Sequence, residues 1–155
     1  MNPVDTKTLT TLEYYQLKDI LPHAYPFLMI DRVIDIKKGE SLVAIKNITA
    51  NEWPFDDFSS DVKYFPETLL IEAAAQAALV LYHVSKVGEG EKPGYAIGKI
   101  SAEFFKDVQI GDQIEIKVTA GKLLSTGGYA DIDILTTQHP AAKIQAFFSV
   151  QKQND

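Results

Sequence analysis

One segment, from Glu67 to Val87, is apolar on nearly every side when it is wound as a helix. Its sequence, ETLLIEAAAQAALVLYHVSKV, is rich in Ala and Leu, which favour helices, and Pro66 stands at a position typical of a helix start. A helix that is apolar all round is a buried one. We therefore predict a central helix over about 66–87, enclosed by other elements. Polar residues interrupt its apolar run, so it does not have the roughly 20 mostly apolar residues of a membrane span.

Strand patterns flank this segment on both sides. Before it, residues 27–36 and the alternating segment Ser41–Asn51 predict a hairpin, and Thr10–Glu13 match a capping box that should start a short helix over about 11–20. After it, four strands are predicted, at Tyr95–Phe105, Gln113–Gly121, Tyr129–Thr137 and Ala142–Gln151. Short turns between strands favour an antiparallel sheet. We predict one α+β domain over residues 1–155, with a curved sheet wrapped around the central helix.

Composition and charge exclude several classes of protein. The chain has no Cys, which rules out disulfides and thiol nucleophiles and fits a cytoplasmic protein. Its net charge of −6 argues against a nucleic-acid partner. The N-terminal residues carry no basic stretch followed by an apolar one, so no signal peptide is expected. No motif for a nucleotide or another cofactor is present, and the three His residues lack the spacing of a metal site.

Four ordered blocks of the chain resemble the 3-hydroxyacyl-[acyl carrier protein] dehydratase family. LPHAYPFLMIDR at Leu21–Arg32 is similar to that family's LPHRYPFLLIDR, and AIKNIT at Ala44–Thr49, followed by an Asn-Glu pair, is similar to AIKNVTxNE. LLIEAAAQAA at Leu69–Ala78 resembles LIIEALAQAA, and the Gly111–Gln113 turn resembles VVPGDQ. The resemblance spans about Leu21 to Val150. It implies the hotdog fold and an acyl-thioester substrate on coenzyme A or on an acyl carrier protein.

The resemblance also implies which residues carry chemistry. In this family a loop His removes the α-proton of a 3-hydroxyacyl thioester, and a helix carboxylate from the other subunit helps the hydroxyl to leave as water. Glu72 falls on that carboxylate, and Gln76, one helical turn later, falls on the residue that steadies it. Because a Glu in an apolar helix is desolvated, we expect its pKa to rise. The substrate should lie beside the helix start, so contacts are expected from Phe58, Tyr64, Phe65, Pro66 and Glu67.

The chain departs from the family at the catalytic loop. The ungapped alignment puts Phe58, fourteen residues before Glu72, at the position of the family's His, and a shift of one residue puts Asp57 there instead. Phe cannot move a proton, and Asp, with a reference pKa of about 3.9, is a weak base. Glu67 replaces a Gly that would let the thioester approach the backbone; alternatively, its side chain points to solvent and favours the helix start.

Other His residues are not expected to replace the missing one. His23 belongs to the opening motif and is interpreted as structural. His83 lies eleven residues after Glu72, roughly 16 Å along a helix, which is too far to share a substrate atom. His139 falls in a predicted turn. Glu103 and Phe105 stand where the family usually has Arg, which weakens attraction to an acidic carrier protein.

Three functions remain open from the sequence. The chain could be a thioesterase that uses Glu72, with Asp57 or Asp56 assisting and the loop aromatics Trp53, Phe55, Phe58, Tyr64 and Phe65 lining an acyl pocket. It could be the partner subunit of a His-bearing paralogue in a heteromeric dehydratase. It could be a non-catalytic acyl-binding protein of fatty-acid or polyketide-type metabolism, while dehydration by Asp57 is least favoured. Because one sheet covers the helix only partly, we expect a homodimer or larger assembly.

Overall fold

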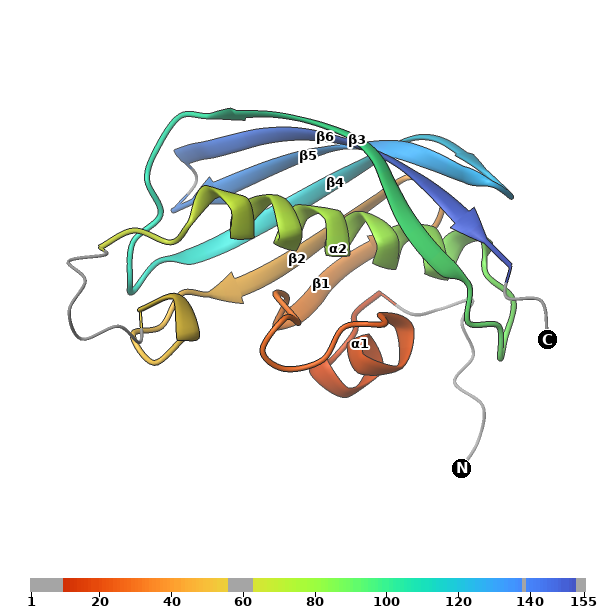
Figure 1. The fold of residues 1–155 in the computed structure, drawn as a ribbon, viewed down its shortest axis with the longest axis horizontal. Helices are drawn as coiled ribbons and strands as arrows, with labels where there is room; N and C mark the ends of the chain where they lie inside the picture. Colours follow the sequence, from red (N-terminus) through yellow and green to blue (C-terminus); the bar gives the residue numbers. More distant parts are fainter. Residues whose placement is uncertain (1–9, 56–62, 138, 153–155) are drawn as a thin grey trace.

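The computed structural model describes residues 10–55, 63–137 and 139–152. The elements follow in the order α1 (Tyr14–Ile20), β1 (Arg32–Lys37), β2 (Ser41–Asn47), the 3-10 helix η1 (Trp53–Phe55), α2 (Glu67–Lys86), β3 (Gly94–Phe104), β4 (Gln113–Leu124), β5 (Gly127–Thr136) and β6 (His139–Gln151). The strands form one six-stranded antiparallel sheet. The predicted α+β architecture, a curved sheet around a central helix, is confirmed (Figure 1).

The helix α2 is the centre of the domain. Its bounds agree with the predicted 66–87 to within one residue, because Pro66 is the N-cap and Val87 the C-cap. Between Leu69 and Tyr82, only Ile71 and Glu72 are not fully buried. The helix contacts β2, β4, β5 and β6 on one face of the sheet, and α1 also contacts it. By length and composition α2 could also span a membrane, but 67% of its most apolar 18-residue window is buried inside the domain, as in a core helix.

The strand order is β1-β2-β4-β5-β6-β3. Strands β4, β5 and β6 pair in sequence, as short turns favour, but β3 pairs with β6 and not with β4. All four predicted strands are therefore present, and only β3 does not pair with the next strand in the chain. As a result β3 forms one edge of the sheet and β1 forms the other (Figure 1).

The start of the first helix differs from the prediction. The backbone of Leu12 exchanges two hydrogen bonds with that of Val33, at 3.0 and 2.9 Å, so one residue of the predicted capping segment Thr10–Glu13 is bridged to β1. The helix starts at Tyr14, with Glu13 as its N-cap. The backbone N–H of Glu13 donates to Oε1 of Gln16 at 2.8 Å, which makes the capping pair one turn later than predicted.

The predicted strand 27–36 is also shorter than expected. Its first residues are not paired in the sheet, because the backbone of Phe27 and Met29 bonds instead to the side chain of Gln76 on α2. Strand β1 begins only at Arg32. The segment from Leu21 to Asp31 is therefore a connection that lies against the central helix, and this places the opening motif beside α2.

The predicted strand Ser41–Asn51 ends early, at Asn47, where a turn begins. The carboxylate of Glu52 accepts the backbone N–H of Thr49 at 3.2 Å and pairs with the buried ammonium of Lys46 at 3.1 Å. Lys46 also lies 5.7 Å from the centre of the Phe65 ring. These contacts anchor both ends of the loop between β2 and α2 to the core.

Candidate functional site

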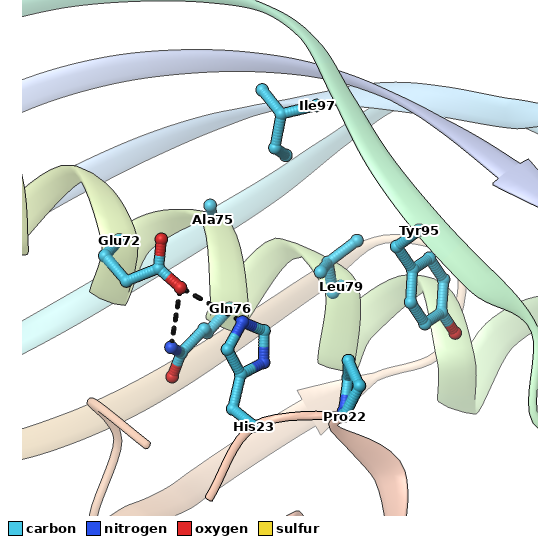
Figure 2. Close-up of a pocket in the computed structure, with 8 residues that line it drawn as sticks. All are labelled: Pro22, His23, Glu72, Ala75, Gln76, Leu79, Tyr95 and Ile97. Carbon is cyan, nitrogen blue, oxygen red and sulfur yellow. Dashed lines mark hydrogen bonds and ion pairs between the residues drawn. The ribbon is translucent and has the colours of Figure 1, made fainter. Parts of the chain in front are cut away.

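A pocket of about 150 Å³ lies between α2, the connection after α1, and the edge strand β3. Its lining residues are Pro22, His23, Glu72, Ala75, Gln76, Leu79, Tyr95 and Ile97, drawn in Figure 2. The polar side chains of His23, Glu72 and Gln76 gather at one end of this group, and Leu79 and Tyr95 lie at the other. The pocket thus combines one carboxylate with an apolar wall, which suits a ligand with a reactive polar group and a hydrocarbon portion.

Gln76 is completely buried and fixes the carboxylate of Glu72. Its amide nitrogen donates to Glu72 Oε1 at 2.9 Å and to the carbonyl of Phe27 at 2.6 Å. Its amide oxygen accepts the backbone N–H of Met29 at 2.8 Å. The predicted supporting contact between Gln76 and Glu72 is therefore present, and the same side chain ties α2 to the opening motif.

His23 approaches Glu72 from the connection after α1. Its Nε2 lies 3.1 Å from Glu72 Oε1, the oxygen that also accepts the Gln76 amide. Within the described part of the chain, the hydrogen bonds to this carboxylate all end on Oε1, and Figure 2 shows Oε2 directed away from both donors. The side chains of His23 and Glu72 are 25% and 37% exposed, so a small molecule can reach the pair.

The pKa of Glu72 is lowered from its ordinary value of 4.5, contrary to the predicted rise. The hydrogen bond from His23 is the largest influence and lowers the pKa; burial raises it, and the Gln76 hydrogen bond lowers it further. The prediction considered burial alone and was wrong because two donors outweigh desolvation. At neutral pH this carboxylate is ionised, with one oxygen held and the other available.

Four of the residues expected to touch substrate near the helix start do not line this pocket, and the fifth, Phe58, lies outside the described residues. Phe65 is 2% exposed in the core, and its ring lies 6.3 Å from that of Phe55. Tyr64 is exposed and bridges to Gln109, Pro66 caps α2, and Glu67 is exposed at the first helical position. None of these four lines the pocket at Glu72. Trp53, by contrast, packs 5.8 Å from the ring of Phe27, whose carbonyl bonds to Gln76.

Asp56, Asp57 and Phe58, the candidates for the missing loop base, lie outside the described residues. No group of three or more metal-binding side chains occurs in residues 10–55, 63–137 and 139–152. His139 begins β6 and is exposed; the strand starts three residues before the predicted Ala142 because β5 and β6 stay paired up to Thr136 and His139. Within the described part of the chain, Glu72 therefore has only His23 as a neighbouring imidazole.

The far end of the pocket carries a second polar pair. The hydroxyl of Tyr95 lies 3.2 Å from Nδ1 of His83. Burial lowers the pKa of His83 and, together with the neighbouring Tyr82, raises the pKa of Tyr95 to about 12. Both groups are consequently neutral near pH 7, and they share one hydrogen bond. Tyr82 itself packs edge-on against Tyr95, with ring centres 6.2 Å apart.

The half-buried His83 should make the domain less stable in mild acid. Because its pKa is lower in the folded chain than in the unfolded chain, the unfolded chain binds the proton more tightly, and stability falls as pH drops below about 6.5. We expect the urea midpoint to decline between about pH 7.5 and about pH 5.5, and this decline to shrink in His83→Gln, which still bonds to Tyr95. An equal decline in both proteins would show that His83 is not responsible.

Solved structures with the same fold place the domain in a class. The dehydratase heterocomplex ApeI:P from Xenorhabdus doucetiae aligns with a TM-score of 0.70 over 90% of this chain and 91% of that one, at 13% identity. A mutant of the thioesterase PA1618 from Pseudomonas aeruginosa aligns with a TM-score of 0.66 over 91% and 95%, also at 13% identity. At such low identities these likenesses establish the fold alone, and the domain is a hotdog fold.

The family is shown by sequence. Residues 21–138 match the FabA-like domain family. The 3-hydroxyacyl-[acyl-carrier-protein] dehydratase FabZ of Pelotomaculum thermopropionicum is 36% identical over 141 residues, covering 90% of this chain and 99% of that protein. The chain therefore belongs to the FabA-like family, as the four sequence blocks predicted.

Sequence reasoning did not place His23 beside Glu72. The two residues are 49 positions apart, and the motif LPH gave no sign of which side chain it meets. One signal was available, since Glu72 is the single carboxylate in the apolar body of the helix and needs a buried partner. His23 and Gln76, both in matched family blocks, supply it.

Proposed function

We propose that this protein is an acyl-thioester enzyme in which Glu72 is the catalytic base, and that thioester hydrolysis is the reaction its site fits best. The observation that carries the proposal is the state of the Glu72 carboxylate: ionised, held at Oε1 by His23 and Gln76, and open at Oε2. An oriented carboxylate with one open oxygen can take a proton from a water molecule.

The reaction balances with the groups present. Glu72 accepts a proton from water while the water oxygen bonds to the thioester carbonyl carbon. The tetrahedral intermediate then collapses, the carbon–sulfur bond breaks, and the proton on Glu72 passes to the leaving thiolate. The acyl group would lie against Ala75, Leu79 and Ile97. The lowered pKa keeps the base ionised at neutral pH, and it also makes the carboxylate a weaker proton acceptor.

Dehydration makes the opposite demand on the carboxylate. The family reaction implied by the resemblance needs a proton for the departing hydroxyl, and a carboxyl group with a lowered pKa holds its proton poorly near neutral pH. The same reaction needs a second group to remove the α-proton, and the segment 52–66 contains no His. These two features favour hydrolysis over dehydration for the chain on its own.

A second function is favoured by the missing loop His. A chain that keeps Glu72 could complete a dehydratase site with a paralogue that supplies the His. A dehydratase heterocomplex with this fold is known from Xenorhabdus doucetiae, which supports such an arrangement. In that setting the partner would supply the α-proton base and could shift the pKa of Glu72 upward.

One assay separates these functions. The purified chain is incubated with a panel of acyl-CoA and 3-hydroxyacyl-CoA thioesters, and free thiol and enoyl product are followed together. Thiol release by the chain alone supports hydrolysis. Enoyl product that appears only after a His-bearing paralogue is added supports the partner function. Enoyl product from the chain alone contradicts both.

We also propose that a second copy of the chain covers the pocket at the edge strand β3. A pocket of about 150 Å³ is small beside the roughly 300–1,000 Å³ of typical ligand sites. Tyr95 and Ile97 on β3 form one of its walls, Ile97 is 44% exposed, and β6 is the strand's partner within the described sheet. An exposed apolar edge strand is a ready surface for pairing.

This arrangement predicts that Ile97→Lys disrupts the assembly. A charge placed in an apolar interface is costly, so we expect the dimer dissociation constant to rise by about tenfold or more. Leu124→Lys is the matched control, because Leu124 is 48% exposed and lies at the end of β4. Light scattering over a dilution series should give the molar mass of a dimer for both the wild type and the control. A wild-type monomer would contradict the proposal.

A further inference from the structure

His23 is held against Glu72 by the same segment that binds Gln76. The connection after α1 supplies the His23 ring, and the carbonyl of Phe27 and the N–H of Met29 fix the Gln76 amide. One short stretch of chain therefore supplies one donor to this carboxylate oxygen, His23, and fixes the other, Gln76 on α2. This arrangement gives the opening motif a contact with the candidate catalytic group, beyond any packing role.

The two ring nitrogens of His23 have different surroundings. Nε2 lies on Glu72 Oε1, whereas Nδ1 is buried and has no hydrogen-bond partner among the described residues. A proton on Nδ1 would be a buried donor without an acceptor, which is unfavourable. A hydrogen on Nε2 has no such cost, because Nε2–H donates to the carboxylate.

We propose that His23 is a positioning residue, which in its Nε2–H tautomer donates to Glu72 Oε1, keeps the carboxylate ionised and leaves Oε2 directed at the bound thioester. The role of Oε2 rests on the proposed function; the donation from His23 does not. His23 thus acts through Glu72 and is not itself the base. Gln76 acts in the same way on the other side of Oε1, so the carboxylate is oriented by two donors.

Among the described residues that line the pocket, few other titratable groups lie near Glu72. The residues that face it from the connection after α1, from α2 and from β3 include two titratable side chains, His23 and Tyr95. Tyr95 is at the far end of the pocket and, with its raised pKa of about 12, stays neutral. Removal of the His23 donor should therefore be felt directly in the ionisation of Glu72.

The tautomer is tested first, on the free protein at neutral pH. Nitrogen-15 NMR of the His side chains distinguishes a protonated from an unprotonated ring nitrogen, and His23→Phe identifies the His23 signals. We expect Nε2 to carry a hydrogen. A ring with its hydrogen on Nδ1 and none on Nε2 would overturn the proposed role of His23.

The ionisation of Glu72 is tested next by carboxyl carbon-13 NMR, with the Glu72 signal identified by its loss in Glu72→Gln. In His23→Phe the ring shape is kept and the donor removed, and we expect the midpoint of the Glu72 titration to rise by about one pH unit. His23→Gln keeps an amide donor, so its Glu72 titration midpoint should lie between those of the wild type and His23→Phe. His23→Asn, whose amide is too short to reach Glu72, replaces the Phe variant if the latter is unfolded by circular dichroism.

The outcomes separate this inference from the proposed function. An unchanged Glu72 titration in His23→Phe or His23→Asn would overturn the positioning role, whatever the activity. A raised titration in a protein that hydrolyses no thioester would leave the positioning role standing and refute hydrolysis. If hydrolysis is observed, the acid limb of its pH–rate profile should move upward together with the NMR titration, and kcat should fall more than KM rises.

Discussion

Replacing Glu72 with Gln should lower thioester hydrolysis by about two to four orders of magnitude, the usual contribution of a general base. The amide has nearly the shape of the carboxylate, and its oxygen can still accept from His23 and Gln76, so the fold should be retained. What is lost is the ability of the second oxygen to take a proton from water. The effect should fall on kcat, measured as free thiol released under saturating acyl-CoA.

Glu67→Gln is the matched control for this experiment. It makes the same chemical change on the same helix, but Glu67 is exposed at the first helical position and does not line the pocket. We expect its activity to stay within about threefold of the wild type, as for an exposed substitution away from the chemistry. If Glu72→Gln retains more than about a tenth of the wild-type kcat, a loss of under about 1.4 kcal/mol, Glu72 is not the base.

Replacing Gln76 with Ala should destabilise the domain by about 2–4 kcal/mol. The side chain is completely buried, and its removal leaves the N–H of Met29 and the carbonyl of Phe27 without their partner. Each buried polar group left unsatisfied costs about 1–3 kcal/mol, and truncation also leaves a cavity. The free energy of unfolding, from urea titration followed by circular dichroism, measures this effect.

Two further variants serve as controls for the loss of stability in Gln76→Ala. Gln76→Leu restores most of the volume but none of the hydrogen bonds, so it should recover only the cavity part of the loss. Gln109→Ala removes an exposed side chain and should change stability by less than about 0.5 kcal/mol. A loss below about 1 kcal/mol for Gln76→Ala would mean that the opening motif does not depend on this residue.

The central helix could be predicted from the sequence because its signal is local and strong. Apart from Glu72 and Gln76, all residues from Leu69 to Leu81 are apolar, and Pro66 marks the start. The existence of β3, β4, β5 and β6 was likewise confirmed from alternation and turns. In each of these cases the residues that determine the element are neighbours in the chain.

The errors arose where distant residues decide the local structure. Leu12 pairs with Val33, which delays the first helix, and Gln76 binds the backbone of Met29, which keeps the segment before β1 out of the sheet. The direction of the Glu72 pKa depended on His23, 49 residues earlier. Periodicity and capping patterns contain no information about such contacts.

The position of β3 at the sheet edge has a consequence for how the chain folds. During synthesis β3 emerges before β4 and β5, yet its pairing strand β6 is the last of the sheet to be made. The β4–β5–β6 meander can form by adding one hairpin to the next, whereas β3 must wait until a loop of distant residues closes. Such non-local pairing slows folding. We therefore expect β3 to dock late, so that the wall of the pocket formed by Tyr95 and Ile97 is completed after the helix-bearing core.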